Sequence, residues 1–544
     1  MSSTQTRRRG WQIAAGIVIG GLVIVGLFRL NPYRPAPRAN QAGEIDMPAP
    51  IGNAGPERIS AGENIRVEMI DESDGALRAV LTASRADPLG DHRYTIDEPR
   101  VTYFHRDGQT IYMRADHGEV YIPAGQEHPE HGSLSGNVEI RLFDPVGAGS
   151  AVDVDDDRPV MIGYFESVRF DTTLGQLSTE RPIRIVGDEF VVRGVGLDAL
   201  ANLSDGSLNS LRITRGRFAR YVPSAAVGAS RPRETRSHRA HPAQATPPAA
   251  QSRPSGAPAE AASGPQPTDR LYRIDFADDV ALTRGGRRIE SDQLSLWVRL
   301  RDNRLPEGAI PQLKGVSKRS SAPGVPFGPA LAHAITRFIP AAQPQGEANE
   351  PIDDRLPIEL RWSGPMIVTP LDETPSELAG GNHVFARFSS SPTGQVRISD
   401  TRTGSTATCA WMEYAATTQI ARMGGEGEAG VRLLAPSEDR GTVEARLAMI
   451  EVDLGRRTFD IPGPGFADNA ETGQRIEWAT HASGDLAVDR ERVIGVERAL
   501  FEGAATVISP DGRASGDSLT ATFEPTGGSM RLRRADFEGH ASAR

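Results

Sequence analysis

The sequence of 544 residues has little cysteine, few aromatic residues and no excess of positive charge. Its single cysteine, Cys409, allows no disulfide within the chain and excludes a paired-cysteine zinc or redox motif. Aromatic residues make up 6% of the chain and hydrophobic residues only 38%. The formal net charge of −10 gives no general attraction to nucleic acid, and no basic stripe marks any part that we expect to fold. These absences disfavour nucleic-acid partners and disulfide or thiol chemistry.

Long hydrophobic runs are equally scarce, because only one occurs, between Gly10 and Phe28. This uncharged run follows three consecutive arginines that start at Arg7, and it is long enough for a helix that crosses a bilayer. A cleaved signal peptide has a shorter apolar core and a small-residue cleavage site, which this sequence does not offer. Residues 1–30 are therefore predicted to form a cytoplasmic stub and an uncleaved transmembrane anchor.

Glycine and proline are abundant, at 57 and 40 residues, and favour short strands with many turns over helices. Between residues 58 and 221 apolar and polar residues alternate in short runs, which is the period of half-buried strands. Residues 31–57, 222–270 and about 306–351 are instead rich in proline and alanine. The chain is thus predicted to be all-β, with a tether, a first β-domain at 58–221, a disordered linker, and a second β-domain at 271–544 that contains a disordered insertion.

The second β-domain contains an internal repeat. The residues from Phe276 read F-A-D-D-V-A-L and those from Phe501 read F-E-G-A-A-T-V. In both copies an aspartate, Asp292 or Asp517, follows the phenylalanine by 16 residues. A third, partial copy begins at Phe537. Repeated strand pairs that bury a face only when stacked are typical of a solenoid or an elongated open barrel.

Several short pieces of the first β-domain follow one another in a characteristic order. A strand ends at Pro99, an alanine and a glycine stand at Ala115 and Gly118, a central strand carries Gly136-Asn137-Val138, and a late strand runs from Leu177 through Pro182 to Ile183. In this order the domain resembles the LptC/OstA-like family of periplasmic proteins that export lipopolysaccharide. The repeat of the second domain is similar to OstA-like units.

The resemblance implies an open β-jellyroll with an apolar concave face, fixed in the inner membrane by a single helix while the bulk of the chain lies in the periplasm. It implies as partners lipopolysaccharide or a related lipid, the transmembrane subunits of an ABC transporter, and other OstA-like β-proteins. Gly16 and Gly20 of the anchor have the G-x-x-x-G spacing that permits close packing between helices. We therefore expect them at a contact with a membrane partner.

Strand alternation separately predicts one apolar face in the first β-domain, where an acyl chain could lie. The candidate lipid-groove residues are Ile96, Val101, Tyr103, Ile111, Met113, Val138 and Ile140. No catalytic residue, metal or cofactor is expected. The main hypothesis is a membrane-anchored component of lipopolysaccharide transport that binds acyl chains in this groove. The alternative is an envelope scaffold that pairs with other β-proteins and transfers no lipid.

Two motifs suggest other chemistry but have no supporting residues nearby. Gly516-Asp517-Ser518-Leu519 spells the nucleophile block of the GDSL hydrolases, yet no Asp-x-x-His follows it, so we expect a turn and a strand. A hydrolase that uses Ser518 remains a third hypothesis. His117, His128 and His131 lie near acidic residues, but their spacing fits no usual zinc or copper pattern.

Overall fold

The computed structural model describes residues 62–70, 76–104, 110–124, 129–143, 153–155, 157–187, 190–201, 208–221, 269–284, 286–301, 358–381, 383–392, 394–401, 404–425, 430–437, 441–489, 492–526 and 529–544. The predicted anchor with Gly16 and Gly20, the tether and the insertion lie outside these residues. Of the predicted linker only residues 269–270 are described, and they already belong to a strand. None of the described helices is both long and apolar enough to cross a membrane.

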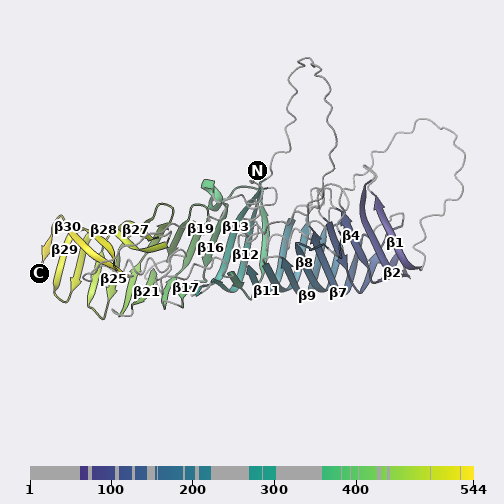
Figure 1. Ribbon diagram of the computed structural model, residues 1–544, viewed down its shortest axis with the longest axis horizontal. Coiled ribbons are helices and arrows are strands. Elements are labelled where there is room, and N and C mark those ends of the chain that lie inside the picture. Colours follow the sequence, from purple (N-terminus) through teal and green to yellow (C-terminus); the bar gives the residue numbers. More distant parts are fainter. Residues whose placement is uncertain are drawn as a thin grey trace, which may run out of the picture.

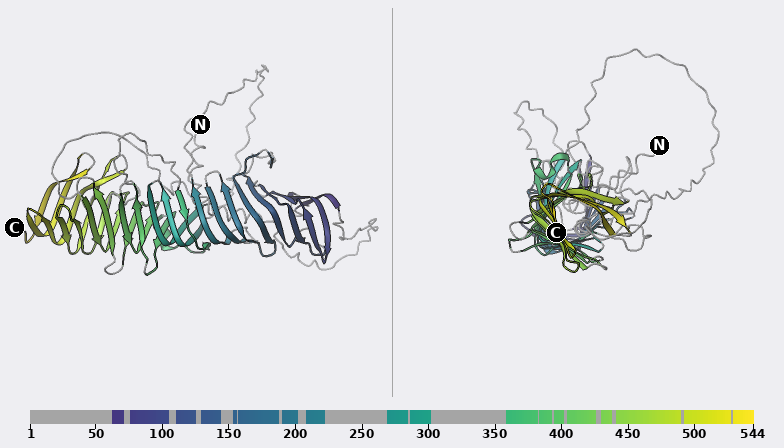
Figure 2. Two further views of the ribbon diagram at one scale, coloured as in Figure 1. Left: turned by 90° about the horizontal axis from the view of Figure 1, so that it is seen from below. Right: turned by 90° about the vertical axis from the view of Figure 1, so that its left-hand side faces the viewer.

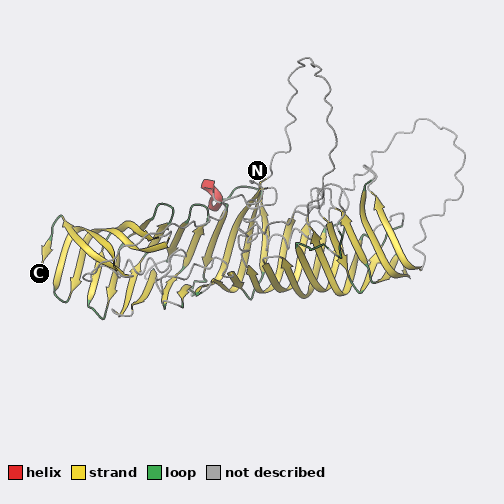
Figure 3. Cartoon of the chain, viewed as in Figure 1, coloured by secondary structure: helices red, strands yellow, loops and turns green. Residues whose placement is uncertain are grey.

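The described chain forms one antiparallel sheet of 31 strands, which confirms the all-β prediction (Figure 1). The first eleven strands are β1 (Gly62–Ile70), β2 (Leu77–Gly90), β3 (Arg93–Asp97), β4 (Arg100–Phe104), β5 (Thr110–Arg114), β6 (His117–Tyr121), β7 (His131–Phe143), β8 (Met161–Asp171), β9 (Gln176–Gly187), β10 (Phe190–Ala201) and β11 (Leu208–Tyr221). A short 3-10 helix, η2 (Ser376–Gly381), is the single helix within the described part, shown red in Figure 3.

The remaining strands follow the same alternating pattern after residue 268. They are β12 (Asp269–Arg284), β13 (Arg287–Arg301), β14 (Ile358–Arg361), β15 (Met366–Leu371), β16 (Val384–Ser389), β17 (Val396–Asp400), β18 (Ser405–Cys409), β19 (Trp411–Ala415), β20 (Ile420–Gly424), β21 (Val431–Ser437), β22 (Gly441–Leu447), β23 (Met449–Asp453), β24 (Thr458–Pro462), β25 (Gly465–Asn469), β26 (Gln474–Trp478), β27 (His481–Asp489), β28 (Arg492–Ser509), β29 (Gly512–Thr526), β30 (Ser529–Glu538) and β31 (Ser542–Ala543).

The sheet is folded along its length into two arms that meet at a corner. Strand β7 shows the arrangement, because its first half pairs with β6 and its second half with β5. The first arm contains β3, β6, β15, β16, β19, β20, β23, β24 and β27, the second arm contains β4, β5, β14, β17, β18, β21, β22, β25 and β26, and the long strands cross from one arm to the other. Each rung therefore consists of one bent strand or of two short strands, and Figure 2 shows these rungs side by side along the long axis.

The corner is made by residues in the left-handed region of the backbone. In β7 these are Gly136 and Asn137, with φ of 73° and 48°. In β12 they are Asp278 and Asp279, and in β28 Gly503 and Ala504. Glycine, asparagine and aspartate adopt this conformation at the smallest steric cost, which explains their place in these strands. A β-bulge in the pairing accompanies each of these three corners.

The sequence repeat coincides with this corner. Phe276 faces Leu294 in the β12–β13 pair, and Phe501 faces Leu519 in the β28–β29 pair. The bulge follows at the same distance in both pairs, between Ala277 and Val280 and between Glu502 and Ala505. The repeat is therefore structural as well as sequential.

One rung lies out of sequence order and joins the two predicted domains. β14 and β15 lie between β11 and β12, because each pairs with both of them. At the corner of this rung the Trp362 ring lies over Gly216 and meets the Phe276 ring edge to face at 5.1 Å. The described strands of the two predicted domains thus belong to one sheet. The division into two domains stays a prediction.

The sheet is elongated, with β1 at one end and β30 and β31 at the other (Figure 1). Ten rungs consist of two short strands and eleven of one strand, so the 31 strands form 21 rungs. Since neighbouring strands lie about 4.8 Å apart, these rungs extend over roughly 100 Å. Buried apolar side chains form one cluster through almost the whole length, from Ala79 on β2 to Phe523 on β29. The core of this protein is therefore a long strip between the two arms.

Candidate functional site

The space between the arms holds the main apolar cluster of the sheet. Along the second half of β7, Val138, Ile140 and Leu142 are buried in the main apolar cluster, while Glu139 and Arg141 pair with each other on the opposite face. This alternation follows from the period of two in a strand. The apolar residues that the sequence singles out therefore face the interior of the fold.

The structure brings six of the seven candidate groove residues together. Val101 on β4, Met113 on β5 and Ile140 on β7 are successive cross-strand partners in one row. Tyr103 and Ile111 are partners in a neighbouring row, and Val138 lies on the same face of β7 as Ile140. Ile96 is placed elsewhere, on β3 of the first arm, where it packs in a separate cluster with Ala83, Val120 and Ile122.

The candidate groove is filled by its own side chains in the described state. Ile111, Val138 and Ile140 are each 1% exposed, and Tyr103 is 4% exposed. Met113 is partly buried and packs against the same cluster. An acyl chain that enters at this level has to displace these side chains, and this requires the two arms to move apart.

The two ends of the sheet have free strand edges. Among the described strands, β1 pairs only with β2, and β30 and β31 pair only with β29. Ile70 and Leu77, which are partners at one end of the β1–β2 pair, are 59% and 38% exposed. An edge of this kind presents unpaired backbone groups that can hydrogen-bond to an added strand.

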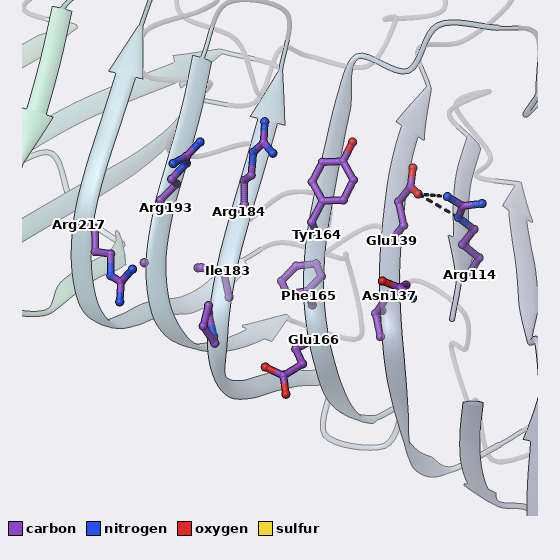
Figure 4. A pocket seen from close by; sticks show the side chains of 13 residues that line it. Arg114, Asn137, Glu139, Tyr164, Phe165, Glu166, Ile183, Arg184, Arg193 and Arg217 are labelled. Atoms are coloured by element: carbon purple, nitrogen blue, oxygen red, sulfur yellow. Dashed lines mark hydrogen bonds and ion pairs between the residues drawn. The ribbon is translucent and has the colours of Figure 1, made fainter. Parts of the chain in front are cut away.

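A pocket on the outer side of the sheet was not predicted from the sequence. It has a volume of about 680 Å³ and lies across β7 to β11 (Figure 4). Figure 4 shows Arg193, Arg184, Tyr164 and Glu139 along one side of it, with Arg217 and Glu166 toward the other. In the sequence, the arginines of this pocket in β9 and β10 are marked only by their polar positions next to apolar ones. Many other arginines have such positions, so the pattern does not single out this pocket.

The motifs that suggested other chemistry are separated or embedded in strands. His117 and His131 lie near opposite ends of β6, where His117 contacts Asp97 at 3.0 Å and His131 stacks on Tyr121. His128 lies outside the described residues. No group of three or more His, Cys, Asp or Glu side chains suited to a metal ion occurs in the part of the chain that the structure describes.

Ser518 lies within strand β29, where its cross-strand partners are Glu502 and Glu538. Two carboxylates beside a serine oppose the negative charge that builds up when an ester is attacked. The nearby His540 contacts Asp517 at 3.0 Å through its Nδ1 atom. Burial raises the pKa of the Cys409 thiol to about 12, so this side chain is a protonated member of the core.

Comparison with models of protein families finds no match for this chain, and no curated protein matches it. The functional interpretation therefore depends on the geometry of the fold.

Proposed function

We propose that this protein is a membrane-anchored periplasmic component of lipopolysaccharide transport, or of the transport of a similar glycolipid, and that it holds acyl chains between its two arms. The observation that carries the proposal is the long apolar cluster that runs from β2 to β29. Residues 1–30 supply the anchor, and the periplasmic strands form an open β-jellyroll of OstA-like units.

A repeated apolar interior suits the movement of a lipid along the molecule. Burial of each CH₂ group stabilises an acyl chain by about 0.8 kcal/mol, and successive rungs offer similar apolar surroundings. A chain that shifts from one rung to the next exchanges one such environment for another, so no rung acts as a deep trap. Directional movement then depends on supply from the membrane end.

The fold also leaves a route into this interior. Within the described strands, every cross-strand pairing joins segments of the same arm. The backbone therefore connects the two arms only at the corner, and elsewhere they meet through side chains. Parting the arms along the opposite margin breaks no backbone hydrogen bond of the sheet. The free edges of β1 and β30 supply the places where other β-jellyroll proteins extend the path.

A second candidate function is an envelope scaffold that pairs through the same edges and transfers no lipid. One observation favours it, namely the close packing of Ile111, Val138 and Ile140, each 1% exposed. A packed interior stabilises a rod without any ligand.

Photo-crosslinking separates the two functions. A photoreactive residue at Tyr103 faces the interior, whereas one at the adjacent Thr102 faces the opposite side of β4. The transport function predicts that Tyr103 captures a lipid in the cell envelope and that Thr102 does not, as read by mass spectrometry of the adducts. Equal capture at both positions, or none at Tyr103, would leave the scaffold function as the better account.

The variant Val138→Asp sharpens this test, because Val138 is 1% exposed. If the arms part to admit lipid, the carboxylate reaches water at the margin, so the protein keeps its melting temperature within a few degrees while crosslinking from Tyr103 disappears. If the interior is a closed core, the buried charge costs several kcal/mol and the protein melts much earlier or does not express.

A further inference from the structure

The pocket on the outer side of β7 to β11 collects arginines that form no ion pair among the described residues. Arg184 on β9 and Arg193 on β10 are direct cross-strand partners. Like charges directly opposite in a sheet destabilise it. Neither arginine forms an ion pair with any carboxylate in the part of the chain that the structure describes. The opposed arginines therefore destabilise the folded sheet, which suggests that they serve a purpose other than stability.

A third arginine reaches the same pocket through a β-bulge. In the β10–β11 pair Arg193 faces Phe218 and Gly194 faces Gly216, which leaves Arg217 as the extra residue of the bulged strand. Bulges of this kind redirect a side chain. Arg217 is exposed, lines the pocket, and likewise has no ion pair within the described residues (Figure 4).

The two carboxylates of the pocket are already engaged with other arginines. Glu139 accepts hydrogen bonds of 2.6 Å from both Arg114 and Arg141. Burial alone would raise the pKa of Glu139, but these two hydrogen bonds outweigh it and hold the pKa below its usual range. Glu166 lies 3.9 Å from Arg181, outside the three-arginine group. The charges of Arg184, Arg193 and Arg217 are thus left for a ligand.

The chemistry of the lining points to one class of ligand. Guanidinium groups bind phosphate oxygens through paired, charge-assisted hydrogen bonds. Beside them, Tyr164 is 39% exposed and has Arg184 over its ring at 5.6 Å, so an aromatic surface adjoins the positive charge. Glu139 and Glu166 add oxygens that can accept hydrogen bonds from hydroxyl groups.

We propose that this outer pocket binds a phosphorylated sugar, with the phosphate held by Arg193 and Arg217 and the sugar ring against Tyr164. Two sources share this chemistry: a free sugar phosphate and the phosphorylated headgroup of a glycolipid. The charged side chains of the site lie on the outer face, whereas Val192, next to Arg193, is buried in the core, and Ile183 borders both the pocket and the core. The inference therefore stands or falls independently of acyl-chain transport.

Calorimetric titration of the full chain in detergent at low salt tests the site. Glucose 1-phosphate should bind, glucose should not, and added salt should weaken the binding because the contact is ionic. Arg193→Gln and Arg217→Gln should each weaken binding at least tenfold, since each removes hydrogen bonds to a charged group. The matched control is Arg212→Gln, an exposed arginine of β11 outside the pocket, which should leave binding unchanged.

A structural role for these arginines predicts a different result. If Arg193 serves only the fold, Arg193→Gln lowers the melting temperature. If it serves a ligand, removing one of two opposed charges leaves the melting temperature unchanged or raises it while binding is lost. Tyr164→Ala should weaken glucose 1-phosphate and leave the weaker binding of inorganic phosphate unchanged.

The source of the ligand is read from a second titration, with micelles that contain a phosphorylated disaccharide lipid or, as control, phosphatidylglycerol. Arginine-dependent binding of the disaccharide lipid alone assigns the site to a headgroup, and binding of glucose 1-phosphate as well assigns it to phosphorylated sugars in general. Equal binding of phosphatidylglycerol, binding of neither ligand, or variants that bind as tightly as the parent would overturn the proposal. Lipid capture from Tyr103 is unaffected by any of these outcomes.

Discussion

The two faces of β9 and β10 differ in chemistry although they belong to the same strands. Ile183 and Val192 face inward and belong to the long apolar cluster, while their neighbours Arg184 and Arg193 face outward into a charged pocket. On a packed inner face, apolar residues of similar volume usually replace one another at small cost in stability. The outer face acquires its character only from the register, which sets Arg184 opposite Arg193. One strand can thus have an inner face that any well-packed apolar sequence would provide and an outer face whose charges depend on the strand register.

The largest expected effect comes from the same substitution on both faces of β10. Val192→Asp places an unpaired carboxylate at a position that is 4% exposed, which should cost about 4 kcal/mol or more, or prevent expression. Val191→Asp, one residue away, places the carboxylate on the outer face, where water and neighbouring arginines stabilise it. Thermal unfolding of the two variants measures the difference. Equal destabilisation would contradict the assignment of faces.

A smaller difference is expected between two tryptophans. Trp362 is 3% exposed and fills the corner of the joining rung. Trp362→Ala should therefore lower the free energy of local unfolding by about 3–5 kcal/mol. Trp411 is only partly buried and covers Gly424 across β19 and β20, so Trp411→Ala should cost clearly less. Hydrogen exchange of peptides from β11 to β15 and from β19 to β20 reports each effect separately. A larger opening around β19 than around β14 would reverse the expected order.

Ion pairs on the outer face should contribute little to the free energy of unfolding, and the contribution of those that contain histidine should depend on pH. His481 bridges Asp460 at 2.7 Å and Glu502 at 2.9 Å, and these two hydrogen bonds raise its pKa despite partial burial. A raised pKa means that the stabilisation is complete below the unfolded value of about 6.5 and is lost as the pH rises through the folded value. The variant His481→Gln should therefore lose about 0.2–1 kcal/mol at pH 5.5 and nothing at high pH. Melting curves across this range, compared with the pH-independent loss from Trp362→Ala, provide the check.

The smallest effect is expected at Ser518, which lies between two glutamates on the outer face of β29. Ser518→Ala removes one hydroxyl from a partly buried position on the outer face, so stability should change by less than about 0.5 kcal/mol. Lipid capture from Tyr103 should also be unchanged. Loss of function with normal melting would instead support the hydrolase hypothesis.

The inner face was predictable because it depends on local alternation. Val138 and Ile140 could be assigned to one face from the period of two alone. The repeat at Phe276 and Phe501 predicted stacked strand pairs, and the structure adds that each copy lies at a corner of the sheet. Ile96 could not be placed with the others, because the chain turns the corner between β3 and β4 and carries it to the opposite arm.

The outer pocket and the joining rung were not predictable from local patterns. The opposition of Arg184 and Arg193 depends on register between strands, and the sequence does not show which of many exposed arginines will face each other. The return of β14 and β15 to a place between β11 and β12 depends on a pairing over a long sequence separation. Neither feature has a signature within a single strand.

The joining rung has a consequence for the chain while it is being synthesised. Outside β10, the strand β11 pairs only with β14 and β15 among the described strands, and Leu371 emerges about 150 residues after Tyr221. At about 5–20 residues per second, the finished N-terminal rungs wait roughly 8–30 s with this edge uncovered. An uncovered edge can pair with another nascent chain, so the interval between translation of Tyr221 and of Leu371 is when this protein is most exposed to misassembly.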